Sequence, residues 1–253
     1  HYLPKPKGAT FELNRGTFVT TNLNDEFFGS DFVGGTRKMS KEVRYQFRPS
    51  DVTVGPDGAV YITDWIDGRV GGHADLDDSC SGTIYRIAPK GFKPQVPKFD
   101  LKTIEGAITA LSSPAINTRY LGFVALKKQG EAAIPALEKL LGHSNKFVAA
   151  RAVWVLPHLG DKGIAACAKL LGNKDAQVRI AAYRAFRRAG QDILSYAAKL
   201  ATDSDPGVRR DVALSLRALP AHKLTSLTRM PSKRSASVPP TRKAKSGSQS
   251  KQR

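Results

Sequence analysis

The stretch from about Leu101 to Pro220 repeats itself with a period of 30 residues. Its four copies begin at Ser112, Gly142, Gly172 and Thr202. In the aligned copies one apolar column holds Leu126, Leu156, Phe186 and Leu216, and one glycine column holds Gly130, Gly160 and Gly190. A strict period of this length, with glycines at fixed offsets, predicts a stacked array of small units rather than one globular core.

Each copy carries the apolar spacing of two helices. In the third copy the predicted apolar faces are Val178, Ala181, Ala182, Ala185 and Phe186 on the first helix, and Leu194, Ala197, Ala198 and Ala201 on the second. Asp175 and Asp205 precede first helices and are suited to cap them, and Pro206 suits a first helical turn. The pattern resembles HEAT-like repeats in a short form. We therefore expect an α-solenoid of four repeats over residues 111–220.

A column of arginines runs through the copies and has two interpretations. It holds Arg119, Arg179 and Arg209, with Ala149 as the exception in the second copy. In the structural interpretation each guanidinium bonds an acidic or carbonyl partner in the neighbouring copy and fixes the stacking. In the functional interpretation the arginines form a ladder of cations for an anionic ligand.

Other side chains of the array are expected at its surface. Arg184, Arg187 and Arg188 are predicted to lie on a solvated outer face, and Trp154 to be half-exposed. His143 and His158 have no partners at metal-ligand spacing and are predicted to be surface residues.

The first 100 residues lack helical periodicity and carry glycine, proline and aspartate between short alternating runs. Residues 49–64 predict an antiparallel hairpin with one buried face and a turn at Pro56-Asp57-Gly58, and residues 82–87 predict a third strand. A weaker hairpin is predicted from Ala9–Leu13 and Thr17–Thr20, and another strand at Glu42–Phe47. Strands of this number and length suit one or two blades of a β-propeller. The sequence starts at His1 rather than Met, so we expect a fragment or a processed product.

Three parts of this chain together resemble a known family. They are residues 7–13, the run Pro49–Trp65 with its Pro-Asp-Gly turn, and Gly82–Gly91, followed by the repeats with Arg151–Leu156. This order is similar to the end of the propeller in the bacterial membrane-bound dehydrogenases, which are envelope proteins related to glucose/sorbosone dehydrogenases. The resemblance implies a periplasmic or cell-envelope location, a quinone cofactor and Ca²⁺ in the propeller, and a haem domain with a CxxCH motif. This sequence has no CxxCH and no earlier blades, so no cofactor is demonstrable in it.

An acidic loop follows the predicted hairpin. Its candidate metal-ligating residues are Asp64, Asp67, His73, Asp75, Asp77 and Asp78. Oxygen ligands on a glycine-rich loop suit a hard cation such as Ca²⁺. An exposed aspartate beside a histidine could instead act as a general base, and aspartates also cap turns in solvated loops. The spacing differs from the EF-hand pattern, so these three interpretations stay open.

Charge divides the chain into three segments. Residues 1–100 carry 13 basic and 13 acidic side chains, residues 101–220 carry 18 and 9, and residues 221–253 carry 9 and none. The last segment is rich in Ser, Pro, Lys and Arg and is expected to be disordered. It could bind nucleic acid or an anionic membrane surface. No run approaches 18 apolar residues, so no transmembrane segment is expected.

Taken together, these features predict an α+β multidomain fold. The expected parts are a partial β-propeller over residues 1–92, a linker and first helix over 93–110, the α-solenoid over 111–220 and a basic tail over 221–253. We expect a fragment of a dehydrogenase-like envelope protein, inactive alone, whose HEAT-like arm docks a protein partner; the catalytic residues are unknown. A pure protein-binding scaffold is the alternative. A third hypothesis is nucleic-acid binding by the basic array and tail, as in the HEAT-like alkylpurine glycosylases.

Overall fold

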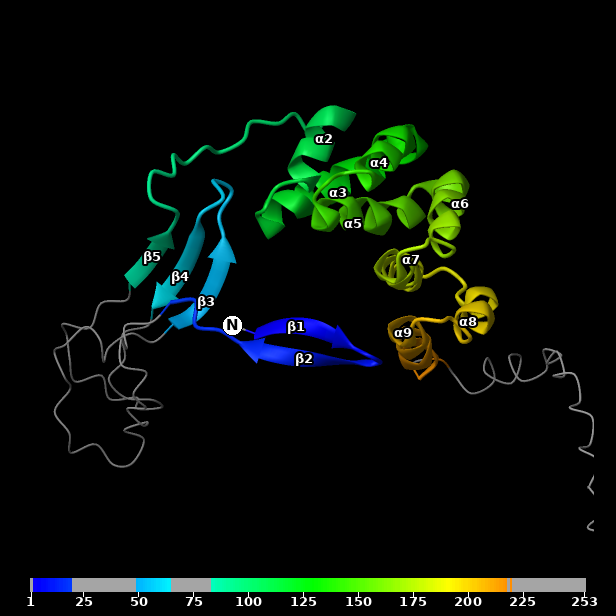
Figure 1. Cartoon of the computed structure of the whole chain (residues 1–253). Coiled ribbons are helices and arrows are strands. Elements are labelled where there is room, and N and C mark those ends of the chain that lie inside the picture. Colours follow the sequence, from blue (N-terminus) through cyan, green and yellow to red (C-terminus); the bar gives the residue numbers. More distant parts are fainter. Residues whose placement is uncertain (1, 20–48, 65–82, 218, 220–253) are drawn as a thin grey trace, which may run out of the picture.

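A computed structural model describes residues 2–19, 49–64, 83–217 and 219. Strands come first along the chain and helices follow, as Figure 1 shows. The predicted strand Glu42–Phe47, Trp65 and the basic tail over 221–253 lie outside the described residues. The fold is therefore mixed α+β in the described part of the chain, with small sheets preceding a helical region.

The N-terminal hairpin differs from the predicted one. Strand β1 (Tyr2–Lys7) pairs antiparallel with β2 (Thr10–Arg15), and Lys7 faces Thr10 across the turn. Gly8 in this turn has φ +57°, a left-handed conformation that glycine adopts without a steric penalty. The predicted strand Ala9–Leu13 therefore coincides largely with β2, but its predicted partner is wrong. Residues 17–19 form no strand, Thr20 lies outside the described residues, and the partner is β1, whose prolines at positions 4 and 6 are unusual in a strand.

The predicted hairpin over residues 49–64 is confirmed and belongs to a three-stranded sheet. Strand β3 (Pro49–Val54) pairs with β4 (Val60–Asp64), which pairs with β5 (Thr83–Ile87), all antiparallel. Asp57 fixes the turn because its Oδ1 accepts a hydrogen bond from the Ala59 N–H at 3.1 Å. Its Oδ2 accepts from Arg86 Nη2 at 2.9 Å, so the turn is also tied to the third strand.

Burial in this sheet is concentrated on its central strand. Ile62 on β4 is 4% exposed, whereas Val52, which faces it on β3, is 61% exposed. The expected buried face therefore covers β4 but not β3, which is at the edge of the sheet. On β5 the predicted alternation is confirmed, because Tyr85 and Ile87 are half-buried and Ile84 is exposed.

The helices follow the 30-residue period closely. The first helices of the four copies are α3 (Ile116–Gln129), α5 (Lys146–Val155), α7 (Ala176–Arg188) and α9 (Pro206–Leu216). They begin at positions 116, 146, 176 and 206, at intervals of 30. The second helices of the first three copies are α4 (Ile134–Leu141), α6 (Gly160–Leu170) and α8 (Leu194–Leu200), and α2 (Ile104–Leu111) precedes the array.

Local sequence sets where these helices begin. Asp175 accepts a hydrogen bond from the Gln177 N–H, and Asp205 accepts from the N–H groups of Gly207 and Val208, so the predicted caps are confirmed. Asn145 caps α5 in the same way by accepting from Phe147 N–H. The glycines of the glycine column have φ of +65°, +78° and +74°, as the helix–helix corner requires.

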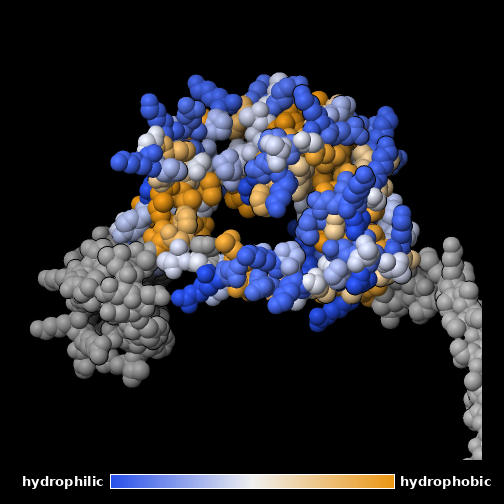
Figure 2. All heavy atoms as spheres, in the orientation of Figure 1, coloured by the Kyte–Doolittle hydropathy of each residue, from blue (hydrophilic) through white to orange (hydrophobic). Residues whose placement is uncertain are grey.

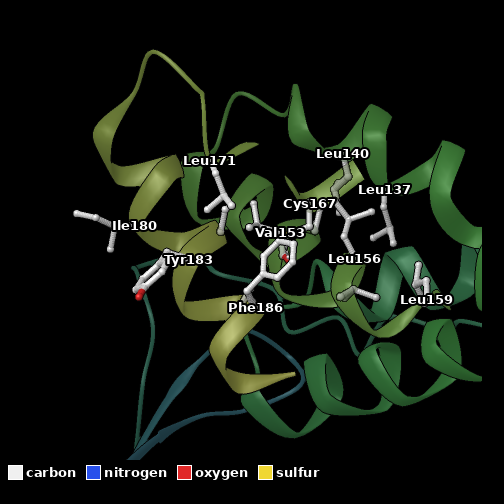
Figure 3. Close-up of a cluster of buried hydrophobic side chains, with 14 of the residues drawn as sticks. Leu137, Leu140, Val153, Leu156, Leu159, Cys167, Leu171, Ile180, Tyr183 and Phe186 are labelled. Atoms are coloured by element: carbon white, nitrogen blue, oxygen red, sulfur yellow. Dashed lines mark hydrogen bonds between the residues drawn. The ribbon is translucent and has the colours of Figure 1, made fainter. Parts of the chain in front are cut away.

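One hydrophobic core runs through the helical region between the first and second helices (Figure 3). In the third copy, Phe186 and Tyr183 are almost fully buried, and Ile180 is buried with them. The expected face of α8 is partly wrong, because Ala201 lies beyond the helix and is exposed, whereas Leu200 is buried. The face of α8 that packs on the core therefore includes Leu200 as well as Ala197.

Helices of neighbouring copies pack against each other in order. Helix α5 packs on α7 and α7 packs on α9, while α2 packs on α3 and α4 on α5. Gly122 lets α2 and α3 approach closely, since a Cβ there would meet the backbone of Leu111 and Ala107. In Figure 1 the helices follow an arc with α3, α5, α7 and α9 on its inner side, and the β1–β2 hairpin lies across from them.

Candidate functional site

The acidic loop predicted as a metal site is described only at its first residue. Asp64 is the last residue of β4, where it faces Thr83 of β5, and it is buried. Asp67, His73, Asp75, Asp77 and Asp78 lie outside the described residues. Within the described ranges, no three His, Cys, Asp or Glu side chains come together as a metal site would need. The Ca²⁺ and general-base interpretations of the loop stay predictions.

The three arginines of the predicted ladder lie at equivalent places, one in each of three copies. Each donates hydrogen bonds to backbone carbonyls of the turn that precedes its own helix. Arg119 reaches the Pro114 carbonyl at 2.8 Å, Arg179 reaches Asn173 at 2.7 Å, and Arg209 reaches Asp203 at 2.6 Å. We call residues 112–115, 142–145, 172–175 and 202–205 the inter-copy turns. The three guanidinium groups hold the first, third and fourth of these turns.

Arg179 also bonds the neighbouring copy. Its Nη2 and Nε donate to the two carboxylate oxygens of Asp203 at 2.6 and 2.8 Å. Both side chains are nearly buried, with 12% and 10% exposed. The hydrogen bond from Arg179 lowers the pKa of Asp203, and the same bond raises the pKa of Arg179. At this position the contact is the one that the structural interpretation describes.

In the second copy the arginine column holds Ala149. A different arginine, Arg151, lies two residues further along the same helix. Arg151 donates from Nη1 to the carbonyls of Leu111 and Ser113, both at 2.9 Å, in the preceding copy. Burial lowers the pKa of Arg151, and the nearby charge of Arg119 lowers it further. The repeat pattern did not predict this contact, because the position of Arg151 holds Leu121, Ala181 and Asp211 in the other copies.

A second charged network joins the last copies to the N-terminal hairpin. Arg184 is exposed, as predicted, and its Nε donates to Oδ1 of the buried Asp211 at 2.7 Å. Arg210 donates to Asp211 Oδ2 at 3.3 Å and lies 4.6 Å from the centre of the Phe11 ring. It also donates to the Ala9 carbonyl at 3.3 Å, so it joins residues about 200 positions apart. Arg187 and Arg188 are exposed, as predicted.

Two further predicted surface residues differ in their surroundings. His143 is exposed, and its Nδ1 accepts a hydrogen bond from the Asn145 N–H at 2.9 Å. His158 is half-buried and packs edge-on against Phe123, with ring centres 5.2 Å apart. Burial lowers the pKa of His158. In the described part of the chain, neither imidazole belongs to a group of His, Cys, Asp or Glu side chains that could hold a metal ion.

Large apolar side chains are exposed along the first helices. Tyr120 and Val124 on α3, Phe147 and Trp154 on α5, and Leu214 on α9 form this set, which we call the first-helix face. Phe147 is 68% exposed and Trp154 is 36% exposed, so the prediction for Trp154 is confirmed. Figure 2 shows hydrophilic residues projecting around the outside of the arc, with apolar residues nearer its inside.

A groove of about 510 Å³ crosses this face between α5 and α7. Its lining residues include Phe147 and Trp154 of α5, Gln177 of α7, and Asn173 and Asp175 of the inter-copy turn before α7. The alanines at positions 149, 150 and 181 are also among its lining residues. The alanines at positions 149 and 181 on α5 and α7 leave this room open. Arginines hold the equivalent positions 119, 179 and 151 in other copies.

Comparison with known proteins bears on the helical region. Residues 134–217 match the family model for HEAT repeats. No curated protein matches the chain. The match begins at α4 and ends one residue beyond α9, so it covers α5, α7 and the groove. This region is HEAT-like, and HEAT repeats suggest a protein-interaction scaffold. Among the described residues, no helix has the length and apolar character needed to cross a bilayer.

Proposed function

We propose that this chain is a docking scaffold. Its helical region, a short α-solenoid of four HEAT-like repeats over residues 111–220, would bind a protein partner on the first-helix face. The observation that carries the proposal is the exposure of Phe147 and Trp154 beside the groove between α5 and α7. Aromatic side chains around a concave site are typical anchors of protein interfaces.

The regular stacking supports the same proposal. First helices that begin every 30 residues present equivalent positions at regular intervals along one side of the array. Stacked repeats of this kind bind extended partners because each level adds a few contacts to a continuous surface. The ladder arginines are directed at backbone carbonyls of their own copies, which supports a structural role over the anionic-ligand one. Of the three, Arg179 makes the predicted bond to a neighbouring copy, whereas the contacts of Arg119 and Arg209 stay within their own.

The proposal for the remainder of the chain depends on resemblance alone. We place the chain in a dehydrogenase-like protein of the periplasm or cell envelope, with residues 1–92 as a partial β-propeller, residues 93–110 as the connection and residues 221–253 as a basic tail. Quinone, Ca²⁺ and haem would belong to other parts of such a protein. Dye-linked sugar oxidation with added quinone and Ca²⁺ tests this parentage, and we expect no turnover by this chain alone.

The docking proposal is tested with two exposed residues of equal accessibility. Phe147 is 68% exposed on α5, and Ile84 is 69% exposed on β5. Partners are captured from the native cell extract, identified by mass spectrometry, purified and titrated against the wild type, Phe147→Ala and Ile84→Ala. We expect Phe147→Ala to weaken binding at least tenfold and Ile84→Ala to leave it unchanged. Equal affinities for all three proteins would refute docking on the first-helix face.

The same titration separates the competing hypothesis. A partner that proves to be nucleic acid, bound with an affinity that falls steeply with salt, would favour the basic array and tail as the binding element. In that case Phe147→Ala would have no effect, because phosphate contacts come from lysine and arginine side chains.

A further inference from the structure

The four inter-copy turns are alike in sequence position but not in how their carbonyls are satisfied. An arginine donates to carbonyls of the turns 112–115, 172–175 and 202–205. No arginine of the described residues donates to the turn 142–145. The carbonyls of His143 and Ser144 are the equivalents of the two that Arg179 contacts in the next copy, Asn173 and Lys174. We call this place the ladder gap.

Two alanines create the ladder gap. Position 149 would supply the arginine from the same copy, as Arg179 and Arg209 do, but it is alanine. An arginine at position 181 would reach the turn 142–145 from the next copy, just as Arg151 reaches the turn 112–115. Position 181 is also alanine. Both alanines line the groove of about 510 Å³, so the room that a guanidinium occupies at other levels is open here.

The acceptors for a guanidinium are nevertheless present. Asn173 takes the position that Asp203 has in the next copy, where Asp203 accepts from Arg179. The two side chains are held alike, since Asn173 Oδ1 accepts from the Asp175 N–H at 2.9 Å and Asp203 Oδ1 accepts from the Asp205 N–H at 2.8 Å. Asp175 also lines the groove and adds a carboxylate.

The cations nearest the groove are engaged away from these acceptors. Arg184 donates to the buried Asp211 of the fourth copy. The Lys146 ammonium lies over the Phe147 ring, 5.4 Å from its centre. Next to the gap stand the aromatic faces of Phe147 and Trp154, which suit the apolar stem of a long cationic side chain or its neighbours in sequence.

We propose that the ladder gap binds an arginine side chain of the partner protein, in a segment that places apolar residues beside that arginine. The inference rests on the proposed docking function and names the chemistry that the groove selects. The incoming guanidinium takes the place that Arg179 fills in the third copy, bonding the carbonyls of His143 and Ser144 and the Asn173 amide oxygen. Arginine is favoured over lysine because its planar fork reaches several acceptors at once.

The test uses capped tripeptides on the full chain. Acetyl-Leu-Arg-Leu-amide is titrated into ¹⁵N-labelled protein, and amide shifts are followed by two-dimensional NMR, with the Leu-Lys-Leu and Leu-Glu-Leu versions as comparisons. We expect saturable shifts of residues 143–145 and 173 with the arginine peptide, binding at least threefold weaker with lysine, and no saturable shift with glutamate. Tighter binding of the glutamate peptide would overturn the proposal, because it would show that the net positive charge of the array, and not the acceptors of the ladder gap, selects the peptide.

Two variants complete the test. Ala149→Arg fills the gap from within, so it should raise the melting temperature and weaken the arginine peptide at least tenfold. Ala165→Arg, at an exposed position on α6, adds the same charge elsewhere and should change neither. If Ala149→Arg fails to fold, Asn173→Ala replaces it and should weaken binding at least threefold. Wild-type affinity in Ala149→Arg, or in Asn173→Ala where it replaces that variant, refutes the ladder gap as the site. The scaffold proposal stands or falls separately on the Phe147 titration.

Discussion

Replacing Arg179 with alanine should destabilise the helical region more than removing any exposed arginine. The side chain makes four hydrogen bonds, two to the Asp203 carboxylate and two to the carbonyls of Asn173 and Lys174. A hydrogen bond to a charged group contributes about 1.5–3 kcal/mol, and an exposed ion pair contributes about 1 kcal/mol or less. Since both partners are nearly buried but Asp203 keeps its bond from Asp205 N–H, we expect a loss of about 2–3 kcal/mol.

The expected change in melting temperature follows from that loss. For a chain of this size, 1 kcal/mol corresponds to about 2–4 °C, so Arg179→Ala should melt about 4–12 °C below the wild type. Circular dichroism at 222 nm during heating and in urea measures both quantities. The matched control is Arg188→Ala, which removes an exposed guanidinium from the same helix and should change the urea midpoint little.

The pH dependence gives a second readout of the same contact. The pKa of Asp203 is lowered below its ordinary value of 3.8, so the pair stabilises the folded state above that pH. This stabilisation is lost as the pH falls through the lowered pKa. The difference between wild type and Arg179→Ala should therefore be largest near pH 7 and shrink below pH 3.8. An unfolding free energy equal to that of Arg188→Ala at pH 7, or a difference that grows in acid, would refute the reasoning.

Three further predictions test the packing of the array. Gly122→Ala should lower the stability by about 1–3 kcal/mol despite its gain in helix propensity, because the added methyl meets the backbone of α2; urea unfolding measures it, and an unchanged midpoint would contradict the close approach. Asp205→Ala should cost about 1 kcal/mol by leaving the N–H groups of Gly207 and Val208 unbonded, whereas Asp205→Asn should keep most of the stability. Burial raises the pKa of the Cys167 thiol to about 12. At pH 8, iodoacetamide should therefore leave Cys167 unlabelled in the folded protein and label it in urea. Labelling of the folded chain would show that the core opens.

Much of the helical region followed from local sequence. Aspartate before a first helix caps that helix wherever the repeat places it, because the acceptor and the free N–H groups are two or three residues apart. The 30-residue period fixed the helix starts for the same reason. The β1–β2 hairpin was not predictable in this way, since prolines masked the strand pattern and the turn depends on Gly8.

The candidate site was only partly visible in the sequence. Ala149 stood out as an exception in the arginine column, but a column says nothing about which carbonyls an arginine reaches. The role of Arg151 is visible only in its contact with the preceding copy, and that of Asn173 only in the hydrogen bond that holds its side chain in the turn of its own copy. The Arg184–Asp211 pair was missed because its members are 27 positions apart and occupy different columns.

By itself the sequence determined that the chain carries repeated helix pairs of fixed length, because periodic apolar positions and caps act over a few residues. Only the tertiary structure decided which face stays exposed, where the arginines donate and where the ladder is open. Those properties depend on how neighbouring helices approach one another. That approach is set by small residues such as Gly122 and Ala149, whose effect appears only when two helices pack.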